Sequence, residues 1–300
     1  MLCAINWPHT KLGLLVDAAL IVLAILAGRS GGSYVEARFV RELSAAASTQ
    51  PAAAEGVIDE RAVSSLPEPV RRYLQSMGAV DRRRDWSVRA GFDARFRRLD
   101  GDWQTCKALQ YDTRLPITRQ FYMQLSLKGV LPVTVRDTYS QGHGTMLAKA
   151  FDLFKVAEGR GNELDVGELV TYLNDAILMA PSLLLGPETT WVEVDSRTFD
   201  VRLSDRGLRV TARVRLDGDG RPLDFSTKDR FLEGLDGKTV RTEWRTPVSG
   251  WQDVNGRKLP IRAQAVWQLS SGAFTYADFT FDPKKIAFNV PPTDGNDSAQ

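Results

Sequence analysis

Residues 86–97 (WSVRAGFDARFR) alternate strictly between apolar or small side chains and mostly polar ones. Because successive side chains of a β-strand point to opposite faces, this period of two predicts a long strand with one buried and one solvated face. The same period returns at residues 117–127, 208–216 and 261–269. The side chains expected to face inward on these four strands are Trp86, Val88, Ala90, Phe92, Ala94, Phe96, Ile117, Phe121, Met123, Leu125, Leu127, Leu208, Val210, Ala212, Val214, Leu216, Ile261, Ala263, Ala265, Trp267 and Leu269.

Asp-Gly or Asn-Gly pairs lie between the predicted strands at residues 100–101, 217–218, 236–237 and 255–256. These pairs supply the positive φ angles that tight hairpins need, so we expect some eleven or twelve strands between residues 85 and 290, in local up-and-down order. A sheet of that size curls because its strands twist. The sequence therefore predicts a mainly β (α+β) fold, with a large curled, half-open antiparallel sheet or barrel covered by a few helices.

Two segments of this domain are predicted to be helical, one near residues 66–77 and one near residues 165–184. The first has an apolar stripe at helical spacing, and in the second Pro181 marks an end or a kink. We expect both helices to cover the apolar face of the sheet. The residues of the second helix that are expected to face the sheet are Leu169, Leu173, Ala176, Ile177 and Ala180.

The N-terminal segment LGLLVDAALIVLAILAG, residues 12–28, is apolar except for Asp17. It is short for a bilayer span of about 20 residues, and a carboxylate is costly inside a membrane. A retained single-pass anchor is our first interpretation, and a cleaved signal or a buried soluble helix are the alternatives. The predicted regions are a membrane anchor or signal segment (1–30), a juxtamembrane helix and linker (31–65), the β domain (66–292) and a disordered tail (293–300).

Several segments together resemble a family of uncharacterised bacterial proteins with N-terminal membrane segments, known as a domain of unknown function. They are LPEPVRRYL, GELVTYLNDAILMAPSLLL, DGRPLDFSTKDRF and the closing stretch from WQDVNGRKLPIRAQAVWQL to DPKKIAFNV. The resemblance covers about residues 66–290 and implies no reaction or catalytic residue. In element order the chain is also similar to the LolA/LppX-like lipoprotein and lipid carriers, which implies a half-open barrel able to hold acyl chains. The expected location is the bacterial cell membrane, with the soluble domain outside the cytoplasm.

The composition excludes several classes of function. The chain has 39 Lys+Arg, 37 Asp+Glu and a formal net charge of +2, so it has no electrostatic signature of nucleic-acid binding. The two histidines, His9 and His143, and the two cysteines, Cys3 and Cys106, provide no cluster with metal-ligand spacing. No phosphate-binding glycine loop or nucleophile elbow is present. We therefore expect no metal, no cofactor and no catalytic residue of a familiar class.

The candidate site residues are polar groups placed where apolar ones are expected. Arg119 occupies an inward position, and an inward arginine needs a carboxylate or an anionic ligand beside it. Glu168 and Asp175 are the possible partners, and with Tyr172 they share one side of the predicted helix. That stripe is interpreted first as a solvated helix face, with a polar cavity rim or an acid–base pair as alternatives. The residues predicted to bind a ligand are Arg119, Phe121, Glu168, Tyr172, Asp175, Trp244 and Trp267.

The leading functional hypothesis is a membrane-tethered, extracytoplasmic and non-catalytic binding protein for an apolar ligand, such as a lipid or acyl chain. An envelope scaffold with a solid core is the alternative, and it predicts an exposed apolar patch instead of a cavity. A hydrolase or isomerase that uses Glu168 and Asp175 is the third reading. The sequence does not indicate an oligomeric state.

Overall fold

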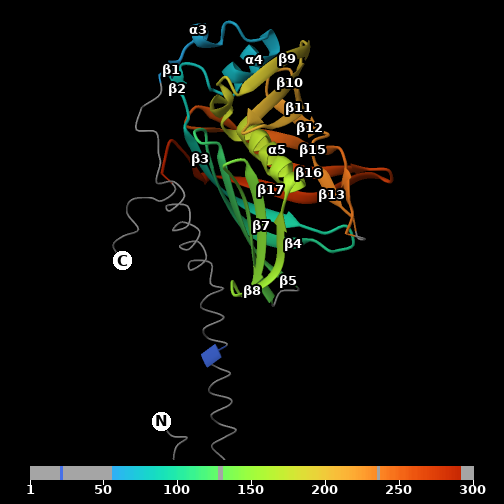
Figure 1. Cartoon of the computed structure of the whole chain (residues 1–300). Coiled ribbons are helices and arrows are strands. Elements are labelled where there is room, and N and C mark those ends of the chain that lie inside the picture. The colour runs from blue at the N-terminus through green and yellow to red at the C-terminus, as the bar shows by residue number, and fades with distance from the viewer. Residues whose placement is uncertain (1–20, 23–55, 128–130, 235–236, 292–300) are drawn as a thin grey trace, which may run out of the picture.

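A 13-stranded antiparallel sheet dominates the computed structural model, which describes residues 21–22, 56–127, 131–234 and 237–291 (Figure 1). The strand order is β8-β7-β6-β5-β4-β3-β17-β16-β15-β12-β11-β10-β9, and the edge strands β8 and β9 do not pair, so the sheet stays open. The predicted large, open antiparallel sheet with few helices is therefore confirmed. Its strands are β3 (Ser87–Phe96), β4 (Gln104–Thr113), β5 (Thr118–Leu127), β6 (Leu131–Ser140), β7 (His143–Ala150), β8 (Phe154–Arg160), β9 (Thr189–Asp195), β10 (Thr198–Asp205), β11 (Leu208–Leu216), β12 (Pro222–Thr227), β15 (Trp244–Val254), β16 (Arg257–Leu269) and β17 (Gly272–Phe288).

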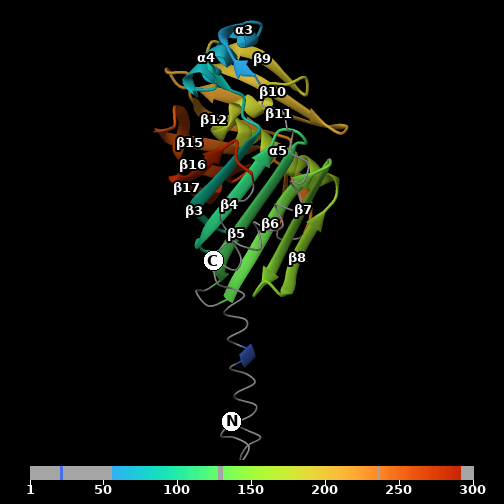
Figure 2. The same cartoon turned by 90° about the vertical axis from the view of Figure 1, so that its left-hand side faces the viewer.

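The chain enters and leaves this sheet at its centre. From β3 it runs outward through successive hairpins to the edge strand β8, as Figure 2 shows. It then begins again at the opposite edge, β9, and returns inward until β17 pairs with β3. The small strands β13 (Phe231–Glu233) and β14 (Thr239–Arg241), which lie between β12 and β15 in the sequence, pair with each other in a separate two-stranded sheet. The first and last strands of the large sheet are thus neighbours.

Helix α5 (Asn162–Met179) carries the chain from one edge of the sheet to the other and lies inside its curve (Figure 1). It contacts β5 to β8 from one half of the sheet and β11, β12 and β16 from the other. Glu168, Tyr172 and Asp175 are only 4%, 1% and 9% exposed, respectively. The interpretation of these three residues as a solvated face is therefore wrong, because the sheet curls around the helix and buries it from Gly167 onward, apart from Thr171.

Helix α4 (Glu68–Ser76) matches the predicted first helix, but it closes one end of the core near β9 and β10. Its Tyr73 packs against Phe199, with ring centroids 5.3 Å apart, and donates a hydrogen bond of 2.7 Å from its hydroxyl to the Ile177 carbonyl. This bond ties α4 to α5. A short 3₁₀ helix, η1 (Pro181–Leu184), follows α5 where Pro181 predicts its end.

The folded domain begins before the expected boundary at residue 66. Strand β1 (Val57–Ile58) pairs with β2 (Arg82–Arg83), and helix α3 (Glu60–Val63) follows β1. Ile58 and Val63 are buried in the main core. Residues 57–63, which the sequence assigns to the linker, therefore belong to the domain.

The predicted membrane anchor at residues 12–28 lies outside the described residues, apart from Ile21 and Val22. The predicted tail at residues 293–300 lies entirely outside them. Across the ranges that the structure describes, no helix is both long and apolar enough to cross a bilayer.

The Asn255-Gly256 turn has the positive φ angles that its sequence predicts, 53° and 75°. The pairs Gln141-Gly142 and Arg206-Gly207 adopt the same positive angles without an Asp or Asn, so the Asp-Gly and Asn-Gly pairs do not mark these two turns. One inward assignment is wrong: Ile261 is 41% exposed. It lies against Gly250, which has no side chain to cover it.

Candidate functional site

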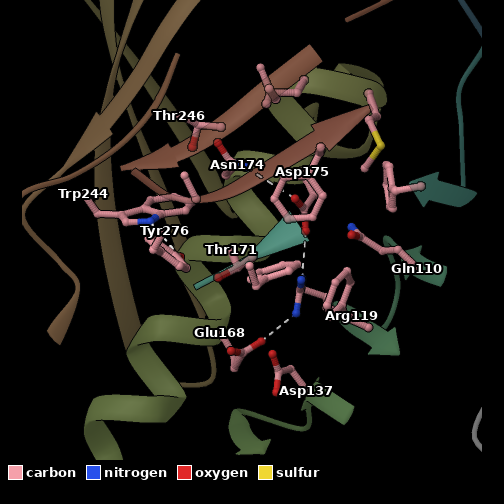
Figure 3. A pocket seen from close by; sticks show the side chains of 18 of the residues that line it. Gln110, Arg119, Asp137, Glu168, Thr171, Asn174, Asp175, Trp244, Thr246 and Tyr276 are labelled. Carbon is pink, nitrogen blue, oxygen red and sulfur yellow. Dashed lines mark hydrogen bonds and ion pairs between the residues drawn. The ribbon is translucent and has the colours of Figure 1, made fainter. Parts of the chain in front are cut away.

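A pocket of about 210 Å³ lies between α5 and the concave face of the sheet (Figure 3). One part of its wall is apolar and is formed by Phe92, Phe96, Phe121, Leu178, Met179, Trp244, Ala263, Ala265, Tyr276, Phe279 and Phe281. The other part is polar and is formed by Gln110, Arg119, Asp137, Glu168, Thr171, Asn174, Asp175, Arg230 and Thr246. The pocket therefore suits a molecule with both an apolar and a polar part.

The apolar wall is built on the pairing of the two central strands. Phe92 of β3 lies directly opposite Phe281 of β17, and their rings meet edge to face with centroids 4.9 Å apart. Phe279 makes a second edge contact with Phe92, at 5.8 Å. Edge-to-face ring pairs add about 0.5–1.5 kcal/mol beyond the burial of their area. On the neighbouring strand β16, Ala263 and Ala265 are small and leave the space that the pocket occupies.

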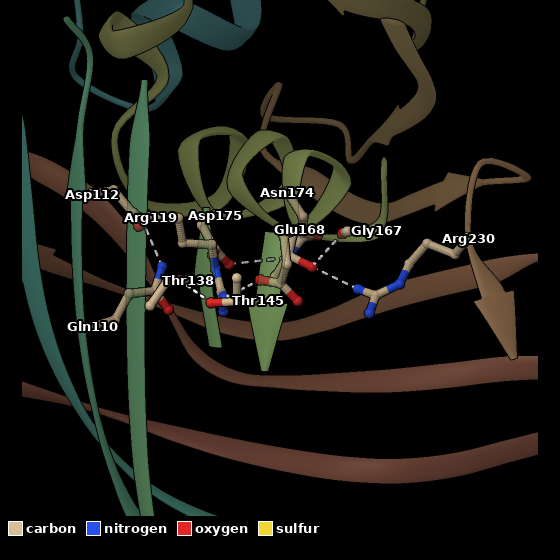
Figure 4. A network of polar contacts seen from close by, with 11 residues as sticks. Gln110, Asp112, Arg119, Thr138, Thr145, Gly167, Glu168, Asn174, Asp175 and Arg230 are labelled. Carbon is tan, nitrogen blue, oxygen red and sulfur yellow. Dashed lines mark hydrogen bonds and ion pairs between the residues drawn. The ribbon is translucent and has the colours of Figure 1, made fainter. Parts of the chain in front are cut away.

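The polar wall is centred on Arg119 of β5, which binds two carboxylates of α5 (Figure 4). Its Nε donates to Asp175 Oδ2 and its Nη1 to Glu168 Oε2, each at 2.8 Å. The sequence predicts one of these carboxylates as the partner, and the structure contains both ion pairs. Two turns of helix place both carboxylates on the side of α5 that faces β5, so one guanidinium group spans them. Arg119 also lies over the ring of Phe121, 5.1 Å from its centroid.

Asp112 adds a third carboxyl group, directly opposite Arg119 on β4. Burial raises the pKa of Asp112 well above its ordinary value, and the charge of Asp175 adds to this effect. Burial by itself would lower the pKa of Arg119, but the charges of Asp175, Glu168 and Asp112 outweigh it and hold that pKa above its ordinary value. Arg119 therefore stays charged, and the protonation state of the cluster is set by its carboxyl groups.

Asp137 of β6 is the fourth carboxyl group, and it faces the pocket beside Glu168 (Figure 3). Burial and the charge of Glu168 raise the pKa of Asp137 to about 7, against the opposing effect of Arg119 and Arg230. A carboxyl group with this pKa exchanges its proton near neutral pH. Strongly shifted groups that line a pocket are characteristic of functional sites, although structural networks also produce them.

Gln110, Asp112 and Asp137 are absent from the sequence prediction, although their positions signalled them. Each lies at one of the alternating positions of its strand that face inward, as Arg119 does. Gln110 and Asp137 both lie directly opposite Phe121, on the strands that flank it. Directly opposite residues of antiparallel strands share a face, so this row of three faces the pocket. A search for polar residues at inward positions of every strand would have found the site.

At the rim of the pocket, Arg230 links the sheet to α5. Its Nη1 donates to Thr171 Oγ1 at 2.7 Å, and its guanidinium carbon lies 4.5 Å from the centroid of the Trp244 ring. The Trp244 indole donates to the Tyr276 hydroxyl at 3.1 Å. Arg230, Thr171 and Tyr276 are partly exposed, so the pocket meets solvent on this side.

Five of the seven residues predicted to bind a ligand line the pocket: Arg119, Phe121, Glu168, Asp175 and Trp244. Trp267 does not line it and stacks on Tyr276, with ring centroids 6.0 Å apart. Tyr172 is buried on α5 without lining the pocket, and burial, followed by the charge of Asp112, raises the pKa of its hydroxyl well above its ordinary value. The role of these residues in binding stays a prediction.

Other reactive side chains do not join this site. His143 begins β7 after the Gln141-Gly142 turn and is exposed, and neither it nor Cys106 lines the pocket. Burial and the charge of Asp93 raise the pKa of the Cys106 thiol to about 12, which keeps it protonated. Within the described part of the chain, no three His, Cys, Asp or Glu side chains form a group that could hold a metal ion.

Comparison with known proteins identifies a family but no characterised relative. Residues 56–279 match a family described as "Family of unknown function (DUF6544)". No curated protein matches the sequence.

Three solved structures are similar at low identity. A putative outer membrane lipoprotein-sorting protein domain from Vibrio parahaemolyticus matches 71% of this chain and 88% of its own, at 8% identity and a TM-score of 0.39. A LolA superfamily protein from Nitrosomonas europaea matches 70% and 90%, at 10% identity and a TM-score of 0.36. A DUF1329 family protein from Desulfovibrio piger matches 78% and 95%, at 8% identity and a TM-score of 0.38. The LolA-like proteins named from the sequence are thus among them, but scores this low carry no argument about the ligand.

Proposed function

Since the chain belongs to a family of unknown function, DUF6544, we propose its function from the pocket itself: the domain binds the apolar part of a small amphipathic molecule. The observation that carries this proposal is the amphipathic pocket between α5 and the concave face of the sheet. Phenylalanine rings on one side and ionised groups on the other suit a ligand with an apolar body and a polar end.

The size of the pocket limits the ligand. Its volume of about 210 Å³ is below the roughly 300–1,000 Å³ of pockets that bury drug-sized ligands, and above the roughly 150 Å³ of an apolar cavity that holds benzene. The pocket therefore accommodates one ring or a short alkyl chain. A long acyl chain would place only its end there, with the remainder leaving past Arg230.

The pocket also bears on the two alternative functions. A scaffold with a solid core does not account for an open space lined by ionised side chains. An acid–base enzyme that uses Glu168 and Asp175 is disfavoured because both carboxylates bind Arg119, at 2.8 Å each. Burial raises the pKa of both carboxyl groups while Arg119 opposes the shift, and protonation of either one would disrupt its ion pair with Arg119.

We further propose that residues 12–28 tether this domain to the bacterial cell membrane, on its outer side. The support is the apolar sequence of that segment, which lies outside the described residues except for Ile21 and Val22. Carbonate extraction of membranes, followed by protease treatment of intact spheroplasts, tests this. Release by carbonate contradicts the tether, and protection of the domain from protease contradicts the orientation.

Blocking the pocket tests the binding proposal. Ala265→Phe places a ring in the space between β16 and α5, whereas Ala273→Phe adds the same ring at an exposed position of β17. Full-length protein in lipid nanodiscs is titrated with methylcyclohexane and cyclohexanol, and the ¹⁹F resonance of fluorotryptophan at Trp244 is followed. We expect saturable shifts in the wild type and in Ala273→Phe, and none in Ala265→Phe. No shift with either compound in the wild type contradicts the proposal.

A further inference from the structure

Three oxygen atoms of the polar wall have no hydrogen-bond partner: Asn174 Oδ1, Thr246 Oγ1 and Asp137 Oδ1. Asn174 and Thr246 are only 5% and 4% exposed. Buried polar atoms in native proteins are nearly always satisfied, so three unpaired atoms around one pocket indicate a group that binds there.

The orientation of the Asn174 amide defines what that group must offer. Its Nδ2 donates to the Asp175 carboxylate, with 3.4 Å between Nδ2 and Oδ1. The reversed amide would place two oxygens together, so the amide oxygen is the atom left for the pocket (Figure 3). An amide oxygen only accepts hydrogen bonds. Asn174 therefore requires a donor from the ligand.

The charges of the polar wall lead to the same conclusion. Arg119 already pairs with two carboxylates, Glu168 and Asp175, and Asp137 adds a further acidic group. Arg230 is the other cation of the described lining, and it already holds Thr171 and covers Trp244. The three carboxyl groups of the lining, Asp137, Glu168 and Asp175, outnumber its two cations, so an anionic group inside the pocket would add to an excess of negative charge.

We propose that the polar end of the ligand is a hydrogen-bond donor, a hydroxyl or a primary amine, with Asn174 as its principal acceptor. Carboxylates and phosphates are disfavoured. This inference rests on the proposed binding function, and it adds the chemical class of the polar group. Thr246, on β15, serves as a second acceptor, since its hydroxyl can accept as well as donate.

Four compounds that share one ring separate the possibilities: cyclohexanol, cyclohexylamine, cyclohexanecarboxylate and methylcyclohexane. Each is titrated into full-length protein in nanodiscs at pH 7, with the ¹⁹F signal of Trp244 as readout and empty nanodiscs as blank. We expect the alcohol and the amine to bind roughly tenfold more tightly than the carboxylate and the hydrocarbon, which is the scale of one satisfied buried acceptor.

Asn174→Leu should reduce that preference to about twofold or less without changing the affinity for methylcyclohexane. Thr246→Val, which keeps the side-chain shape, should also weaken alcohol binding. It replaces Asn174→Leu as the test variant if Asn174→Leu does not fold. Thr190→Val, at an exposed position of β9, is the matched control and should change nothing. If the carboxylate binds as tightly as the alcohol, the inference fails while the binding function stands. If none of the four compounds binds, both fail.

Discussion

Arg119 and Glu168 join the sheet to the helix inside it through a hydrogen-bonded ion pair of 2.8 Å, in which each side chain is 5% exposed. Removing either partner of a pair this deeply buried should lower the stability of the fold considerably, because the remaining charge is left without compensation. It also makes the position of α5 specific, since a slide of one residue along the helix would separate the charges.

Replacing Glu168 by Gln should therefore destabilise the fold. The amide keeps the shape and one acceptor but removes a charge beside Arg119, and we expect the free energy of unfolding to fall by about 1–3 kcal/mol. The comparison is Arg213→Gln, which removes an ion pair with Asp200 in which Arg213 is 52% exposed, and which should cost under about 1 kcal/mol. Urea unfolding followed by circular dichroism measures both. Equal effects of the two changes would show that the buried pair has no special role.

The carboxyl group of Asp137 should make the stability depend on pH. Its pKa is about 7 in the folded chain and roughly 4 when unfolded, so unfolding releases a proton between these values. The free energy of unfolding should fall as the pH rises from about 4 to 7, with a limiting slope of about 1.4 kcal/mol per pH unit, and then level off.

Asp137→Asn removes this contribution, so its slope between pH 5 and 7 should be smaller than that of the wild type. Some slope of the same sign should remain, because burial also raises the pKa values of Asp112, Glu168 and Asp175. Asp100→Asn, in an exposed loop, is the control. Denaturant titrations at intervals of half a pH unit make the comparison, and parallel curves for the wild type and Asp137→Asn would refute the assignment.

Arg230 should slow the exchange of a bound ligand. It lies at the rim, bonded to Thr171 and stacked on Trp244, so we expect a ligand to displace it in order to leave. Arg230→Ala should raise the dissociation rate of cyclohexanol by roughly tenfold, the effect of losing about 1.4 kcal/mol at the barrier. Line-shape analysis of the Trp244 ¹⁹F signal gives the rate. An unchanged rate means that the ligand leaves by another route.

The domain boundary can be tested at Val63, which is 1% exposed in the core. Val63→Ala should lower the free energy of unfolding by about 1–2 kcal/mol through the lost burial and the cavity that remains. Val57→Ala, at a position 60% exposed, is the matched control and should change it by less than about 0.5 kcal/mol. If Val63→Ala leaves the free energy of unfolding unchanged, residues 57–63 belong to the linker and not to the folded domain.

The period of two predicted most of the sheet because each strand buries one face and leaves the other in water, as β3 and β11 do. The same reasoning identified Arg119 and its helix partners, since an inward charge must be compensated. It failed for α5, whose surroundings depend on the two halves of the sheet that curl around it. Asp137 was not predicted because a carboxyl group at an inward position of β6 interrupts the apolar period of two by which a strand is recognised.

The pairing of β3 with β17 has a consequence for how the chain is made. During synthesis β3 emerges early, and its partner on one side, β17, emerges last. Until then the growing polypeptide holds two incomplete halves, and the edge of β3 that pairs with β17 in the finished sheet is open. Contacts between segments far apart in the sequence are slow to form, and apolar surface stays exposed in the meantime. A nascent chain that stalls before residue 272 is thus a candidate for aggregation or for capture by a chaperone.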